Sequence, residues 1–129
     1  MSRLTQVLRS ATSSADPPYC PEAHDVIWLD FDPQTGREQA GRRMALVFSS
    51  RDYNAKTRLC VLCPITTQVK GYPFEAAVPS GLKVEGVVLS DHIKSLSWSD
   101  RRSEFVCKMP EPVVADVLAK IQALLGMKA

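Results

Sequence analysis

Short apolar runs separated by turn residues fill most of this sequence, and only its last segment has helical periodicity. The runs are rich in β-branched and aromatic residues, as strands are. They lie at 25–31, 43–50, 58–65, 74–78, 87–98 and 103–109, with 87–98 forming either one strand or two with a bend. The polar segment 51–57 (RDYNAKT) has the composition of a turn between the second and third runs. Such a succession favours a curled antiparallel sheet or a small antiparallel β-barrel over a parallel sheet with crossover helices.

The segment after Pro110 has the periodicity of one amphipathic helix. Apolar residues recur there at helical spacing, and Gly126 follows at the position of a C-terminal cap. The apolar residues are Val113, Val114, Val117, Leu118, Ile121, Leu124 and Leu125. We expect this helix to cover the open side of the sheet, which gives a mainly β fold with a C-terminal helix.

The chain of 129 residues is long enough for one hydrophobic core and too short for two ordinary domains. We expect a single domain at 25–129, preceded by a flexible extension at 1–24 that is rich in Ser, Thr and Pro. The apolar runs are far shorter than the roughly 20 residues that span a bilayer, and the first residues lack the apolar core of a secretory signal. The sequence therefore predicts a soluble cytoplasmic protein with no membrane partner.

Positive charge is concentrated in one third of the chain. Between residues 37 and 70, seven Lys and Arg residues stand against two acidic residues, a net charge of +5, and the remainder of the chain carries −3. The natural partner of such a segment is rich in phosphate or carboxylate. The alternative is that these cations only keep the surface soluble.

The four cysteines are Cys20, Cys60, Cys63 and Cys107, and two of them have the spacing of a zinc half-site. Cys60 and Cys63 lie within an apolar run, however, and residues three apart on a strand point to opposite faces. Their two thiols therefore cannot hold one ion without a turn between them. We interpret the cysteines as buried small residues in a reducing compartment, and we expect neither a metal nor another cofactor.

Motifs of several common enzyme classes are absent from the sequence, including the phosphate-binding Gly-Lys-Ser/Thr loop, the nucleophile elbow and the zinc-protease motif. The two histidines, His24 and His92, belong to no recognisable constellation. We interpret them as surface or turn residues, and a two-histidine ribonuclease arrangement stays open at this level.

The loop after the first strand and the end of the third strand carry groups suited to phosphodiester chemistry. Glu38, Arg42 and Arg43 lie in or beside the loop, and Thr66 and Thr67 end the strand. When a 2′-hydroxyl attacks its own phosphodiester, a carboxylate can take the proton, while a guanidinium and a hydroxyl hold the phosphoryl oxygens. This chemistry requires no metal. A structural alternative is that Arg43 only opens a strand and Glu38 only pairs with a neighbouring arginine.

Four blocks of the sequence resemble, in their order, those of a known family. The blocks are DVIWLDFDPQTGREQAGRRMALVFS, YNAKT, CPITTQVKGYPFE and GVVLSDHIKSLSW, within about residues 25–126. They are similar to the signature segments of the MazF/PemK toxins, the endoribonuclease halves of bacterial type II toxin–antitoxin pairs. The resemblance implies a sequence-specific, metal-independent enzyme that cuts single-stranded mRNA and leaves 2′,3′-cyclic phosphate and 5′-hydroxyl ends.

The resemblance also implies roles for individual residues. Arg43 matches the arginine that stabilises transition-state charge, Thr66 matches the strand-end hydroxyl that orients the phosphate, and Glu38 matches the loop glutamate, expected to be the general base. An arginine base would need strong local perturbation because the arginine pKa is very high, and the role of Arg43 in proton transfer stays open at this level. The residues expected to contact RNA are Arg37, Gln39, Arg42, Thr67, Gln68, Lys70, Tyr72 and Asp91.

The chain departs from the family pattern at three places. His24 stands where the family usually has Gly, and Met44 stands where it usually has Pro; neither change removes a functional group. In the PemK-like branch an arginine two residues before an aspartate forms an acid–base pair, but this chain has Leu89 before Asp91. The mechanism is therefore expected to follow the MazF-like branch.

The family fold is a small Src-homology-type antiparallel β-barrel of the CcdB/PemK-like kind, with helical additions. Its members are homodimers with RNA lying across the subunit interface, and a MazE-like antitoxin places an acidic segment in the basic groove. We expect the same partners for this chain. Two alternatives remain at this level: a gyrase-poisoning toxin of the same fold, and a non-catalytic RNA-binding barrel.

Overall fold

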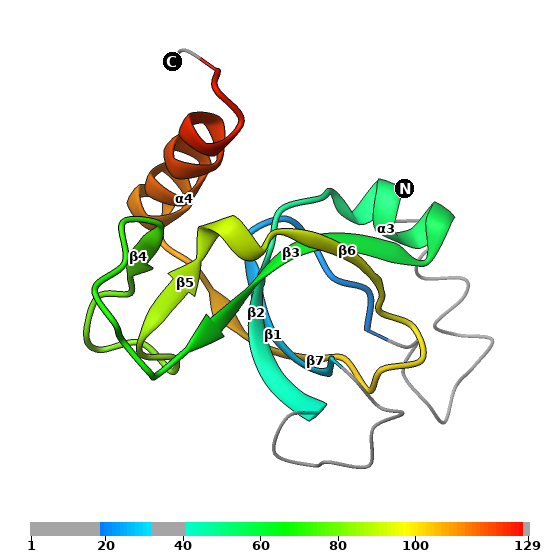
Figure 1. Ribbon diagram of the computed structural model, residues 1–129. Coiled ribbons are helices and arrows are strands. Elements are labelled where there is room, and N and C mark those ends of the chain that lie inside the picture. The colour runs from blue at the N-terminus through cyan, green and yellow to red at the C-terminus, as the bar shows by residue number, and fades with distance from the viewer. Residues whose placement is uncertain (1–18, 32–40, 128–129) are drawn as a thin grey trace, which may run out of the picture.

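Figure 1 shows the computed structural model, which describes residues 19–31 and 41–127. Its strands are β1 (Asp25–Asp30), β2 (Arg42–Val47), β3 (Leu59–Thr66), β4 (Glu75–Ala77), β5 (Val87–Leu89), β6 (Lys94–Ser97) and β7 (Glu104–Lys108). Its helices are α3 (Arg51–Thr57), the 3-10 helix η1 (Ser90–His92) and α4 (Glu111–Leu124). Within these ranges no helix is long and apolar enough to cross a membrane. Every predicted apolar run contains a strand, and the predicted C-terminal helix is confirmed.

The strands form one antiparallel sheet in the order β4-β5-β3-β2-β1-β7, with β6 pairing to a second part of β3. The strands β1, β2 and β3 are successive neighbours and form a meander, in agreement with the predicted antiparallel sheet. Among the described residues, the outer strands β4 and β7 do not pair with each other, because the three-residue β4 reaches only β5. The sheet is therefore curled, as predicted, but it does not close into a barrel (Figure 1).

Strand β3 carries two partners along one edge. β5 pairs with its C-terminal end, where Val88 faces Ile65, and β6 pairs with its N-terminal half, where Lys94 faces Leu62. From Val88 to Lys94 the chain advances six residues, whereas the matching stretch of β3, between Ile65 and Leu62, spans only three. The three extra residues form η1, which is the bend predicted within 87–98.

An apolar cluster lies on each face of the sheet. Successive residues of β1 alternate between them, since Val26 joins one cluster whereas Ile27 and Leu29 join the other. Helix α4 covers the face of Val26 with its buried residues Val113, Val114, Val117 and Ile121. Burial of each such side chain stabilises the fold by about 1.5–3 kcal/mol. The helix predicted from periodicity therefore covers one face of the sheet, as expected.

Cys60 and Cys63 are both fully buried and lie in different clusters on opposite faces of the sheet. This confirms the strand argument against a shared ion. Burial raises the pKa of each thiol to about 12, which keeps both of them protonated. They behave as small apolar core residues, as predicted.

The segment 51–57, predicted to be a turn, is instead helix α3. Ser50 caps its start by accepting a hydrogen bond from the Tyr53 N–H at 3.2 Å, and Asp52 places a negative charge in the first turn. The helix ends at Arg58, which has a left-handed φ of 65° and donates its N–H to the Asn54 carbonyl. Local capping therefore turns a polar, loop-like composition into a helix.

Most of the predicted extension, residues 1–18, lies outside the described residues. Residues 19–24 pack against the domain: Pro21 is fully buried, and its carbonyl accepts a hydrogen bond from the Asn54 amide at 2.8 Å. The Tyr19 hydroxyl donates to the carboxylate of Asp25. The packed part of the chain thus begins at or before Tyr19, and a flexible extension remains a prediction for 1–18.

Candidate active site

The site lies where β2 begins and β3 ends. The two strands pair in a register that ends with Met44 opposite Ile65, and Arg43 and Thr66 are the next residues beyond this last pair. Side chains at facing positions of antiparallel neighbours share a face, with their Cβ atoms about 4.5–5.5 Å apart. Two residues that are 23 positions apart in the sequence are thus brought to one site by the pairing of β2 with β3.

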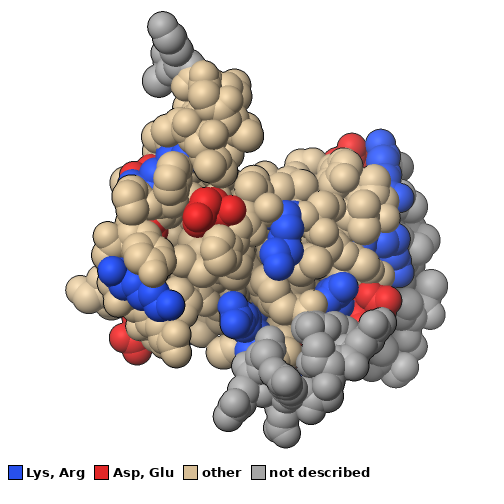
Figure 2. All heavy atoms as spheres, viewed as in Figure 1, with Lys and Arg blue, Asp and Glu red and all other residues tan. Residues whose placement is uncertain are grey.

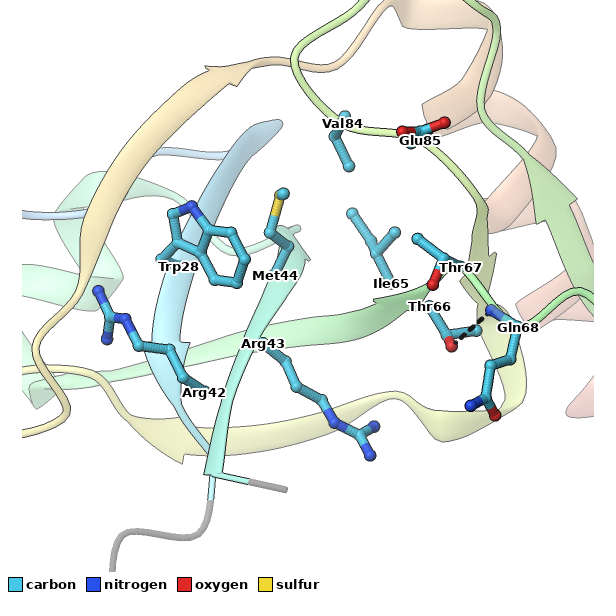
Figure 3. Close-up of a pocket in the computed structure, with 10 residues that line it drawn as sticks. All are labelled: Trp28, Arg42, Arg43, Met44, Ile65, Thr66, Thr67, Gln68, Val84 and Glu85. Carbon is cyan, nitrogen blue, oxygen red and sulfur yellow. Dashed lines mark hydrogen bonds between the residues drawn. The ribbon is translucent and has the colours of Figure 1, made fainter. Parts of the chain in front are cut away.

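Two hollows meet at this point. The first has a volume of about 270 Å³ and the second about 250 Å³. Both are lined by Arg43, Thr66 and Gln68. The first is completed by Trp28, Arg42, Met44, Ile65, Thr67, Val84 and Glu85 (Figure 3), and the second by Lys70, Tyr72, Glu75, Leu89, Asp91 and His92.

Arg43 is exposed, and in the described part of the chain no carboxylate forms an ion pair with it. Figure 3 shows its side chain extending away from Trp28 and Met44 into the open space on the side of Gln68. A guanidinium in this position presents its planar fork of N–H donors to an incoming ligand, and the geometry of that fork matches phosphate.

Arg42, the preceding residue, points to the other face of β2 and is held by an ion-pair cluster. Its guanidinium contacts Asp30 at 3.3 Å and Glu104 at 2.9 Å, and donates to the Arg102 carbonyl at 3.0 Å. It also lies over the Trp28 ring, 6.0 Å from the centroid. We call Asp30, Arg42, Arg102 and Glu104 the ion-pair cluster. The Arg102 guanidinium, followed by that of Arg42, lowers the pKa of Asp30.

Thr66 is oriented by the turn that follows it. Its hydroxyl oxygen accepts a hydrogen bond from the Gln68 N–H at 3.1 Å, which is drawn in Figure 3. Because this bond uses only a lone pair, the hydroxyl hydrogen remains able to donate to a phosphoryl oxygen.

The loop 67–74 is held in place by one carboxylate. Glu75 accepts hydrogen bonds from the N–H groups of Lys70 at 3.1 Å and Gly71 at 2.9 Å. Gly71 has a φ of 80°, a conformation that glycine adopts without strain. This anchoring presents Lys70 and the 61% exposed Tyr72 over the second hollow.

Comparison with known proteins identifies the family to which this geometry belongs. Residues 22–125 match the family model described as PemK-like, MazF-like toxin of type II toxin-antitoxin system. The chain belongs to this family. The endoribonuclease toxin MazF of Escherichia coli (strain K12) is 44% identical over 108 residues, which are 84% of this chain and 96% of that protein. The endoribonuclease PemK of Escherichia coli is 29% identical over 104 residues, 77% of this chain and 78% of that protein.

Solved structures agree with this assignment. MazF (Form-I) from Deinococcus radiodurans matches with a TM-score of 0.78 at 50% identity, covering 85% of this chain and 100% of that one. The MazE-MazF complex (Form-II) from the same organism matches with a TM-score of 0.77 at 45% identity, covering 86% and 100%. The predicted fold and the predicted likeness to the MazF branch are both confirmed.

The positions of the predicted site residues in this MazF-like chain differ. Arg43, Thr66, Thr67 and Gln68 lie together in the first hollow, and Lys70, Tyr72 and Asp91 line the second. Arg42 lines the first hollow, but its donors are engaged by the ion-pair cluster. The predictions for Arg37, Glu38 and Gln39 fall in 32–40, outside the described residues.

The site of the MazF-like chain also contains residues that the sequence did not single out for it. His92 was interpreted as a surface or turn residue and is exposed, but it also lines the second hollow beside Asp91. Its Nε2 lies 3.9 Å from an Asp91 carboxylate oxygen. Trp28 and Glu85 line the first hollow. The sequence signal for His92 was its place directly after a predicted contact residue.

Among the residues that the structure describes, the cations of the basic segment 37–70 do not form one patch in the MazF-like fold. Arg51 pairs with Glu22 at 3.9 Å, Lys56 pairs with Asp52 at 3.3 Å, and Arg58 stacks on a tryptophan ring. On the face shown in Figure 2, Lys and Arg side chains form a broken band across the middle. The net charge of +5 therefore overstates what the site itself uses.

Proposed function

We propose that this MazF-like chain is the endoribonuclease toxin of a type II toxin–antitoxin pair and cleaves single-stranded mRNA at specific sequences. The observation that carries the proposal is the placement of Arg43 and Thr66 where the two hollows meet. It is supported by a relative named endoribonuclease toxin MazF that is 44% identical over 84% of the chain. An exposed guanidinium beside an oriented hydroxyl suits a phosphodiester under attack.

In the proposed reaction, the ribose 2′-hydroxyl attacks the adjacent phosphorus and the 5′-oxygen leaves, giving 2′,3′-cyclic phosphate and 5′-hydroxyl ends. The Arg43 guanidinium stabilises the charge on the phosphoryl oxygens, and the Thr66 hydroxyl donates to one of them. Fixed donors of this kind each contribute about 10²–10³ to the rate. A guanidinium has no acceptor for a proton, so we assign removal of the proton from the attacking 2′-hydroxyl to Glu38 by family resemblance.

The second hollow provides a path for the RNA away from the reacting phosphate. Tyr72 offers a face on which a base can stack, while Lys70 attracts a phosphate. Thr67, Gln68 and Asp91 add groups able to hydrogen-bond to base edges of a single strand. We propose that these residues contribute to the choice of cleavage sequence.

We further propose a cytoplasmic homodimer that is inhibited by an antitoxin with an acidic segment. The MazE-MazF complexes from Deinococcus radiodurans support such a partner. An acidic segment would compete with RNA phosphates for Arg43 and Lys70. Light scattering of the purified chain tests the dimer, and a monomeric mass at working concentration would contradict it.

The first test of the proposed activity uses a long single-stranded RNA in excess chelator, with a copy that carries 2′-deoxy sugars at each cut site. We expect cleavage of the RNA alone, leaving cyclic phosphate ends. Arg43→Ala is expected to slow cleavage by about 10²–10³-fold, whereas Arg51→Ala, a control on α3 outside both hollows, retains it.

Arg43→Lys separates catalysis from binding. It keeps the charge and loses the planar fork, so it is expected to retain much of the salt-dependent RNA binding and to lose most cleavage. Salt-dependent binding by the wild type without cleavage of any RNA would indicate a non-catalytic RNA-binding protein. Normal cleavage by Arg43→Lys would overturn the role given to Arg43.

A further inference from the structure

Gly86, in the turn before β5, lies directly against the backbone at the end of β3. A Cβ atom built on Gly86 would lie 2.1 Å from the Thr66 carbonyl oxygen, 2.8 Å from the Thr66 carbonyl carbon and 3.0 Å from the Thr67 Cα. The contacting atoms are all backbone, so no side chain can rotate away to make room. With its φ of 112°, Gly86 also adopts a conformation that residues with a side chain rarely adopt.

Gly86 is held against Thr66 from both sides. Its carbonyl accepts a hydrogen bond from the Val78 N–H at 3.0 Å, which ties it to the end of β4. The next residue, Val87, pairs with both Ala77 and Thr66. A side chain at position 86 would therefore force the end of β3 to move, because the glycine backbone cannot withdraw.

Such a movement would displace Thr66 more than Arg43. Thr66 would move together with the turn that orients its hydroxyl, through the bond from the Gln68 N–H. Arg43 lies on β2, whose backbone pairing with β3 ends at Met44 and Ile65, one position before the glycine contact. The gap between the guanidinium and the hydroxyl would thus change while most of the sheet kept its register.

We propose that Gly86 is a positioning residue for the cleavage reaction. By lacking a side chain, it lets the Thr66 backbone approach closely and so sets the distance from the Thr66 hydroxyl to Arg43. The inference rests on the proposed endoribonuclease function and adds a residue that touches neither the RNA nor the reacting atoms.

Gly81 provides a matched control. Its φ of 95° is also in the region that favours glycine, but a Cβ atom there would meet nothing within 4 Å. Gly81→Ala therefore introduces a comparable backbone strain in open space, whereas Gly86→Ala introduces strain and a backbone clash beside Thr66. The difference between the two variants isolates the close approach.

The experiment measures kcat and KM for a defined RNA, together with the melting temperature, for the wild type, both alanine variants, Thr66→Ala and the Gly86→Ala/Thr66→Ala double variant. For Gly86→Ala we expect kcat to fall by about 10²-fold with KM changed less than about threefold, since a misplacement of about 1 Å costs that much in rate. Gly81→Ala is expected to keep kcat within about twofold of wild type, with a smaller loss of melting temperature than Gly86→Ala because it adds strain without a clash. In the Thr66→Ala background, Gly86→Ala should lower kcat by less than about threefold, because the hydroxyl it misplaces is gone.

Other results would overturn the inference. A folded Gly86→Ala protein with wild-type kcat would show that the close approach does not position Thr66, and equal losses in both backgrounds would show that Gly86 acts through another group. If Gly86→Ala is unfolded, it is assayed with the wild type in trimethylamine N-oxide, which strengthens the folded state. Failure to fold there, when Gly81→Ala folds, would assign Gly86 to folding alone. A wild type that cleaves no RNA would overturn the proposed function and this inference together, whereas the results above affect the inference only.

Discussion

Two adjacent arginines of β2 lie in neighbouring regions of the sheet that differ in their surroundings. In the ion-pair cluster, Arg42 is surrounded by the carboxylates of Asp30 and Glu104 and by a carbonyl oxygen. At the Arg43–Thr66 site, one residue further along β2, the guanidinium is exposed and faces a hollow. The strand alternates between faces, so one step changes an arginine from a structural ion into an available one. Charge along the sequence does not identify a binding residue until its partners are known.

Replacing each arginine in turn is the strongest test of the difference between Arg42 and Arg43. Arg43→Ala is expected to lower kcat by about 10²–10³-fold, because it removes a donor to the transition state. Its free energy of unfolding should stay within about 0.5 kcal/mol of wild type, since the side chain is exposed. Arg42→Ala should instead lower the free energy of unfolding by about 1–3 kcal/mol, because it removes a charged donor from the partly buried carboxylate of Asp30. Urea unfolding and single-turnover cleavage measure both, and equal losses of kcat would remove the distinction.

Substitution of Tyr72 tests whether the second hollow, beside the exposed Arg43, binds RNA. Tyr72→Ala should weaken binding of an uncleavable 2′-deoxy RNA by about 1–3 kcal/mol, the contribution of one stacked base. Tyr72→Phe retains the ring and should bind like the wild type. Fluorescence anisotropy at fixed salt measures both affinities. Equal weakening by the two variants would point to the hydroxyl rather than to stacking.

Substitution of Asp30 tests whether the ion-pair cluster around Arg42 stabilises the fold. Asp30→Asn is expected to lower the free energy of unfolding by about 1–2 kcal/mol, because it weakens charge-assisted bonds to Arg102 at 2.8 and 2.9 Å and to Arg42 at 3.3 Å. RNA cleavage by the folded variant should be preserved. Chemical denaturation near neutral pH measures the loss of stability.

The pH dependence of stability sharpens the same test. The pKa of Asp30 is lowered in the folded protein, chiefly by Arg102, so its stabilisation is fully present above the unfolded pKa of about 3.9. It is lost as the pH falls through the lower, folded pKa. Wild type should therefore lose more stability on acidification than Asp30→Asn does. Parallel curves for the two proteins would show that the ion-pair cluster contributes no net stability.

The smallest expected effect is that of Glu75→Gln. A glutamine side chain retains one acceptor, so it can replace only one of the two bonds to the Lys70 and Gly71 N–H groups at full strength. We expect about a three- to tenfold loss of affinity for the 2′-deoxy RNA, consistent with one weakened hydrogen bond in an exposed loop. Glu111→Gln, at the exposed start of α4, is the matched control. Unchanged affinity would show that the loop binds RNA without this anchor.

The sequence predicted the elements that depend on local pattern. Alternation placed the strands, periodicity placed α4, and the family resemblance named Arg43 and Thr66 before their pairing was known. The features it missed depend on contacts between distant segments. The Arg42 guanidinium is paired in part with Glu104 on the distant strand β7, and the close approach of Gly86 to Thr66 is visible only once β5 lies beside β3. Helix α3 was missed because its cap outweighs its polar composition.

The three extra residues of η1 lie between β5 and β6 and allow the lining of the second hollow to vary. The registers of β5 and β6 on β3 are fixed separately, on either side of the three extra residues. A change of length within Ser90–His92 would therefore alter Asp91 and His92, which line the second hollow, without sliding either strand. Related chains that differ in length at this point are expected to present different side chains to the second hollow while keeping the strand registers and the Arg43–Thr66 pair.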